Sequence, residues 1–182
     1  MTDKERARLI QNEDVETIRT FVEDHYSSVL RFMRHLTRSI EDAEDLTQQA
    51  FIQARENIAS YRGGSSLRTW LFRVAYHEYT HWRRRRRRWL RLTGWEIAPE
   101  PGYRACVEGA ALLEALHVLP APMREAFLLF EVQEMSLEEV AEVMRVPVGT
   151  VKSRLHHART RLRTYLQEQE EATYGEAVCE RT

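Results

Sequence analysis

The sequence predicts an all-α protein of two small helical domains joined by a flexible linker. Three observations predict this class. Glycine and proline, which disfavour helices, number only 7 and 5 among 182 residues. Apolar residues recur at helical spacing along most of the chain. That spacing is lost near Pro99, Pro101 and Gly102. The expected parts are a first domain at 1–91, a linker at 92–109, a second domain at 110–167 and a short acidic tail at 168–182.

Three helices are expected in the first domain. One covers about residues 15–36, and a second starts at Ser39, with Asp42 three residues later as a capping-box partner. A third runs from about Ser66 into six consecutive arginines at 83–88. At 100° per residue this third helix has one apolar side and one polar side. The polar side carries Thr69, Arg73, Tyr76, Thr80, Arg84 and Arg87.

The second domain is predicted to contain a helix-turn-helix. Apolar helical segments at 112–119 and 123–132 come first, separated by a Pro-Ala-Pro sequence. Ser136 and Glu139 then form the pattern of a capping box that opens a short helix. After a turn at 145–149, a basic helix follows, which is the order of a helix-turn-helix. Its expected buried residues are Val151, Leu155, Ala158, Leu162 and Tyr165.

Charge is strongly segregated along the chain, although the formal net charge is only −1. Residues 61–95 hold ten basic side chains and one acidic side chain, which gives this stretch a net charge of +9. Residues 151–163 hold five basic side chains and no acidic one. Near neutrality alone argues against binding to nucleic acid, but two basic stretches in an otherwise acidic chain favour it.

Several classes of protein are excluded. No apolar run is long enough to cross a bilayer, and the N-terminus lacks the apolar region of a signal peptide. Cys106 and Cys179 stand far apart, so neither a disulfide framework nor a zinc site is expected. His77 and His81 have a spacing that can bind metal, but they lack a third ligand. We therefore expect a cytoplasmic protein that is not an enzyme and has no metal or cofactor.

Three stretches are candidate binding surfaces, and each has a plainer structural interpretation. The basic helix after residue 149 fits the major groove, or it is a solvated helix of a bundle. The aromatic and arginine residues of 61–89 suit single-stranded nucleic acid, although core packing is the favoured role for Trp70, Phe72 and Trp82. Tyr76 is expected on the exposed side. The acidic residues 41–45 either stabilise a helix start or bind a basic partner.

These motifs together resemble a known family. Residues 42–51 (DAEDLTQQAF) and 61–75 (YRGGSSLRTWLFRVA) resemble region 2 of bacterial extracytoplasmic-function (ECF) sigma factors. Residues 119–127 (LPAPMREAF), 136–141 (SLEEVA) and 146–155 (VPVGTVKSRL) resemble region 4 of the same family. The motifs follow the order and spacing of the family over most of 15–166. The turn position that is usually glycine is Arg145 here.

The resemblance implies a promoter-specificity subunit that binds core RNA polymerase, recognises −35 and −10 elements and helps to open the duplex. It assigns −10 recognition to Tyr61, Arg62, Gly63, Gly64, Ser65, Ser66, Arg68, Thr69, Arg73, Tyr76, His77, Thr80, Arg84 and Arg87. It assigns −35 recognition to Thr150, Lys152, Ser153, Arg154, His157 and Arg161. It assigns docking on the coiled coil of the polymerase β′ subunit to Asp45, Leu46, Gln48, Gln49 and Phe51. Residues 123–132 would help to meet the β flap, and an anti-sigma factor is an expected further partner.

Two other functions stay open at this point. A stand-alone DNA-binding repressor or activator would share the helix-turn-helix, and a protein-interaction module could use arginines to bind acidic partners. The acidic 41–51 surface and the aromatic and arginine-rich 61–89 segment would be superfluous in a simple repressor. A sigma factor accounts for both.

Overall fold

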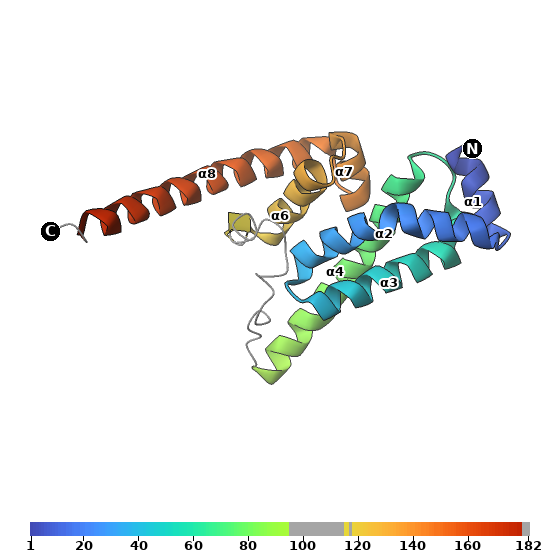
Figure 1. The fold of residues 1–182 in the computed structure, drawn as a ribbon, viewed down its shortest axis with the longest axis horizontal. Helices are drawn as coiled ribbons and strands as arrows, with labels where there is room; N and C mark the ends of the chain where they lie inside the picture. Colours follow the sequence, from blue (N-terminus) through green and yellow to red (C-terminus); the bar gives the residue numbers. More distant parts are fainter. Residues whose placement is uncertain (95–114, 117, 180–182) are drawn as a thin grey trace.

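The computed structural model describes residues 1–94, 115–116 and 118–179, with side chains up to residue 169. Within these ranges every regular element is helical (Figure 1). Most of the expected linker, together with residues 110–114, lies outside the described residues. The elements in order are α1 (Asp3–Gln11), α2 (Val15–Thr37), α3 (Ile40–Asn57), η1 (Ile58–Ser60), α4 (Leu67–Thr93), α6 (Ala121–Phe127), η3 (Leu128–Val132), α7 (Leu137–Met144) and α8 (Val148–Cys179).

Serine caps start three of these helices where the sequence predicts them. Ser39 accepts a hydrogen bond from the backbone of Asp42, and Ser66 accepts one from the backbone of Thr69. Ser136 opens α7 with both bonds of the capping box present. Such caps satisfy backbone N–H groups that have no partner within the helix.

The first domain is a bundle in which α2, α3 and α4 lie side by side and α1 crosses one end (Figure 1). Phe32, Met33, Leu71 and Phe72 are completely buried between these helices. Trp70 is only 2% exposed, so the prediction of core packing for Trp70 and Phe72 is confirmed.

The second domain packs α6, η3 and α7 against the first part of α8. The predicted stripe of α8 is buried at Val151, Leu155, Ala158 and Leu162. The turn before α8 is made by Arg145, whose φ of 53° lies in the left-handed region that normally favours glycine. α8 continues to Cys179, so most of the expected acidic tail prolongs this helix.

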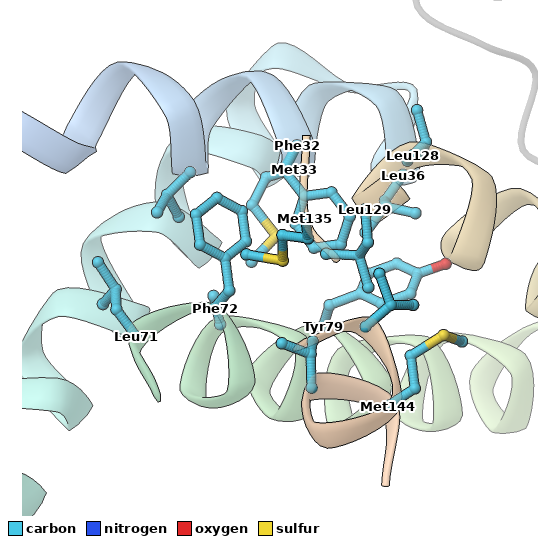
Figure 2. Close-up of a cluster of buried hydrophobic side chains, with 14 of the residues drawn as sticks. Phe32, Met33, Leu36, Leu71, Phe72, Tyr79, Leu128, Leu129, Met135 and Met144 are labelled. Atoms are coloured by element: carbon cyan, nitrogen blue, oxygen red, sulfur yellow. The ribbon is translucent and has the colours of Figure 1, made fainter. Parts of the chain in front are cut away.

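The two domains pack closely against each other. α7 lies along α4, and η3 contacts α2. Figure 2 shows Leu129 and Met135 of the second domain beside Phe32, Phe72 and Tyr79 of the first. All five of these side chains are at most 2% exposed. The domains therefore share one apolar core, an arrangement that the sequence did not predict.

Candidate nucleic-acid interface

The polar side of α4 and the loop before it face acidic side chains of α7. Ser65 Oγ donates a hydrogen bond to Glu142 Oε1 at 2.6 Å, and Thr69 Oγ1 donates one to Glu139 Oε1 at 2.6 Å. Arg73 Nη1 lies 3.2 Å from Glu142 Oε1. The hydrogen bond from the Thr69 hydroxyl, assisted by the backbone at the start of α7, lowers the pKa of Glu139. Glu139 therefore binds α4 as an anion.

A buried carboxylate joins α4 to α6. Glu125 is 1% exposed; it accepts a hydrogen bond from Tyr76 Oη at 2.6 Å and forms an ion pair with Arg83. Burial raises the pKa of Glu125, whereas the hydrogen bond from Tyr76 and the charge of Arg83 act in the opposite direction. Burial and the adjacent Glu125 also raise the pKa of Tyr76, so this hydroxyl remains a donor. Arg83 in addition covers the ring of Tyr79 at 5.3 Å.

The loop at 61–66 has a fixed shape. Tyr61 Oη donates to the carbonyl of Ser65 at 2.7 Å, and the edge of its ring meets Trp70 with 5.9 Å between centroids. Gly63 has φ of 74°, and a Cβ placed there would lie 2.2 Å from Lys4 Cε. Arg62 and Gly64 are exposed at the tip. A glycine is therefore required at 63 by backbone conformation, and the loop presents an arginine to solvent.

The rest of the predicted −10 set divides into covered and exposed residues. Arg68 Nη2 donates to the carbonyl of Gln133 at 2.6 Å, so it also contacts the second domain. Thr80 donates to the carbonyl of His77 within α4. The exposed side chains of this set on α4 are His77, Arg84 and Arg87.

One face of α8 is left open to solvent in its first four turns. The buried stripe at Val151 and Leu155 fixes which side this is. The exposed residues of the predicted −35 set are Lys152, Ser153, His157 and Arg161. Thr150 and Arg154 are half-buried, and Arg154 Nη1 lies 3.9 Å from Met144 Sδ. Arg154 therefore sits at the edge of this face, toward α7.

One side of α3 presents polar residues around an exposed apolar one. Asp45, Gln48 and Gln49 are exposed, whereas Leu46 is a core residue at 6% exposure. Phe51 stacks on Tyr26 with 6.0 Å between ring centroids, so its ring packs beneath the polar face of α3. Ile52 is 51% exposed beside these polar residues. Sequence reasoning missed Ile52, although its i, i+4 relation to Gln48 places both on one face.

Comparison with known proteins decides the family. Residues 21–88 match the model of Sigma-70 region 2, and residues 109–162 match the model of Sigma-70, region 4. The chain is 31% identical to RNA polymerase sigma factor YlaC of Bacillus subtilis over 81% of this chain and 91% of that protein. It is 33% identical to the ECF RNA polymerase sigma factor EcfG of Rhodopseudomonas palustris over 76% of this chain and 79% of that protein. The chain belongs to the ECF sigma factors.

A solved structure extends this likeness to the fold. The sigma factor RpoE from Bartonella quintana, in complex with the anti-sigma factor NepR, superposes with a TM-score of 0.73 at 29% identity. The likeness covers 84% of this sigma factor and 98% of that chain. The protein thus recognises promoters and directs transcription initiation, and in this way it regulates transcription. This family membership replaces the two alternative functions considered from the sequence, a stand-alone DNA-binding repressor or activator and a protein-interaction module.

In this sigma factor, α3 and most of α4 lie within region 2, and α6, α7 and the first part of α8 lie within region 4. No helix in the described part of the chain is long and apolar enough to span a membrane.

Two predictions about the polar side of α4 are wrong. Thr69 is completely buried, and Tyr76 is half-buried with its hydroxyl bonded to Glu125. The cause is the same for both, because region 4 covers this side of α4. The partners Glu125, Glu139 and Glu142 were not singled out from the sequence for this role, and nothing local to them signals it.

Proposed function

We propose that this ECF sigma factor reads the −35 element with the open face of α8 and the −10 strand with α4 and the 61–66 loop. The observation that carries the proposal is the division of α8. One side is buried against α6 and α7, and the opposite side exposes Ser153 and His157 between the cations Lys152 and Arg161.

This arrangement matches the chemistry of the major groove. Hydroxyl and imidazole groups can bond to base edges, whereas lysine and arginine bind phosphates and fix the register of the helix. Lys152 and Arg161 lie on either side of Ser153 and His157 on the exposed face of α8, which is the placement expected for cations that bind the phosphates beside the groove. Arg154, held near Met144, would approach DNA from the side of α7.

The proposed −10 surface combines a rigid loop with a cationic helix. The exposed Arg62 at the loop tip and Arg84 and Arg87 on α4 can neutralise phosphates of a separated strand. Gly63 and Gly64 allow the backbone to approach an extruded base. The expected residues that now contact region 4, among them Arg68 and Tyr76, would become available when the domains separate.

Core polymerase is the proposed partner of α3. Asp45, Gln48 and Gln49 offer polar contacts around the exposed side chain of Ile52, which is the composition of a protein interface with a small apolar centre. The β′ coiled coil is the expected element, and region 4 would meet the β flap. An anti-sigma factor is a further proposed partner, because the Bartonella quintana relative is solved with one.

Reconstituted holoenzyme tests these assignments separately. The double variant Lys152→Ala, Arg161→Ala should keep its affinity for core polymerase but bind promoter DNA with a salt slope lower by about 2, because each lost phosphate contact removes about 1. Arg8→Ala, which removes one exposed charge from α1, should change neither quantity. The double variant Gln48→Ala, Gln49→Ala should weaken core binding, and Gln11→Ala is its control. An unchanged salt slope in the α8 variant would refute the DNA assignment.

A further inference from the structure

The short helix α1 lies beside the 61–66 loop, which the proposed function assigns to the −10 strand (Figure 1). It contacts η1, which comes just before the loop, and α4, which begins just after it. The residues that match Sigma-70 region 2 begin at 21, so α1 precedes the matched segment. A helix outside this segment thus contacts a proposed DNA-reading loop within it.

Asp3 of α1 holds the end of the loop. Its Oδ2 accepts a hydrogen bond at 2.8 Å from the backbone N–H of Leu67, the first residue of α4. This N–H has no partner within the helix, and a carboxylate is favoured at a helix N-terminus. The Ser66 cap uses a different N–H group, that of Thr69. Asp3 therefore fixes the backbone where the loop becomes α4, in addition to the helix's own cap.

Lys4 covers the middle of the loop. A Cβ placed on Gly63 would overlap Lys4 Cε, and it would lie 3.0 Å from Lys4 Cγ and 3.1 Å from Lys4 Cδ. The aliphatic part of the Lys4 side chain therefore lies directly on the Gly63 backbone, as long cationic side chains commonly do on apolar surface. Gly63 is half-buried, whereas its neighbours Arg62 and Gly64 are exposed. The contact thus fixes the segment of the loop between two exposed residues.

α1 is itself anchored to the helical bundle. Ile10 is 4% exposed, and Arg6 Nη2 forms an ion pair with Asp24 Oδ2 of α2 at 2.6 Å. A capping box at the start of α1 fixes the turn that carries Asp3 and Lys4. The two side chains that contact the loop therefore extend from a rigid support.

We propose that α1 is a positioning element for −10 recognition, in which Asp3 and Lys4 hold the 61–66 loop in the shape that discriminates between bases. The proposal rests on the assignment of this loop to the −10 strand under the proposed function. A site that discriminates must hold its groups within about 0.5 Å of the productive geometry. A rigid loop leaves its polar groups unpaired against a wrong base, whereas a loop that can adapt accepts it more readily. Neither Asp3 nor Lys4 has to touch DNA.

The test measures base preference separately from activity. Holoenzyme reconstituted with the full chain forms open complexes on a promoter at which the chain directs initiation, with either the −10 or the −35 element randomised. Sequencing of the bound DNA gives the enrichment ratio of the preferred base at each position. A variant that only lowers the amount of folded sigma factor reduces the yield of complexes and leaves these ratios unchanged.

We expect the double variant Asp3→Ala, Lys4→Ala to lower the −10 enrichment ratio about fivefold at the base that the loop reads, which is the lower end of what one base pair contributes to specificity. The −35 ratios should not change. Lys4→Met keeps the aliphatic stem and should retain the −10 ratio, whereas Lys4→Ala should lower it. Unchanged −10 ratios in the double variant would overturn the proposal, and so would equal losses in Lys4→Met and Lys4→Ala, because the charge and not the packing would then matter.

Two controls test the structural alternative. Arg8→Ala removes an exposed cation further along α1 and should change no ratio. Val29→Ala creates space at a completely buried position of α2, so it should lower the thermal midpoint and leave the −10 ratio intact. A −10 ratio lowered as much by Val29→Ala as by the double variant would show that loss of stability is the cause, and the positioning role would be refuted.

Gly63→Ala separates this outcome from a failure of the −10 assignment, because it distorts the loop directly at a φ of 74°. If Gly63→Ala changes the −10 ratios and the double variant does not, the loop reads the base and α1 does not position it. If neither changes the −10 ratios, the assignment of the loop to the −10 strand fails, and the proposal fails with it.

Discussion

Tyr76→Phe isolates one bond of the interface between the domains. The substitution removes only the hydroxyl that donates to the buried Glu125 at 2.6 Å, and the ring can stay in place. A hydrogen bond to a charged group contributes about 1.5–3 kcal/mol, and the carboxylate that loses it remains buried beside Arg83. We therefore expect the free energy of unfolding to fall by about 2 kcal/mol.

Urea unfolding followed by circular dichroism measures this change. The midpoint should fall while the slope of the transition is unchanged, because the surface exposed on unfolding is nearly the same. Tyr165→Phe is the matched control: Tyr165 is half-buried on α8, and its change should stay within about 0.5 kcal/mol. Equal midpoints for the two variants would refute the role given to the Tyr76 hydroxyl.

Two further predictions concern region 2. Gly63→Ala should cost about 1 kcal/mol in thermal unfolding, since φ is 74° there, whereas Gly64→Ala, with open space around its Cβ, should be nearly neutral; equal effects would contradict this. Burial lowers the pKa of His35 to about 4. Since the unfolded chain takes up this proton below pH 6.5 and the folded chain does not, stability should fall by roughly 2 kcal/mol from pH 7 to pH 5. His35→Gln should lose that part of the pH dependence in urea titrations.

Local features of this fold could be predicted from sequence because their causes are local. The Ser39, Ser66 and Ser136 caps depend on residues three positions apart, and the buried stripe of α8 depends on helical periodicity. The left-handed turn falls at Arg145, the position that the family resemblance marked as usually glycine. In each case the physical constraint acts within one or two helical turns.

The covered side of α4 could not be predicted in the same way. A polar helix face is compatible with DNA, with water or with another domain, and the pattern alone does not distinguish these. Thr69 and Glu139 are 70 positions apart, and nothing in the local sequence of either residue indicates their contact. The burial of Glu125 could not be predicted from local sequence either, because a buried carboxylate can be recognised only when its hydrogen-bond and ion-pair partners are known. The close packing of the two domains against each other was not predicted for this reason.

Transcription from genomic DNA by core RNA polymerase, with and without this chain, tests whether the chain directs initiation at −10 and −35 elements. We predict discrete start sites that depend on the chain, each preceded by common −10 and −35 sequences, and loss of these starts when Lys152 and Arg161 are replaced by alanine. Transcription without any discrete start that depends on the chain would contradict it.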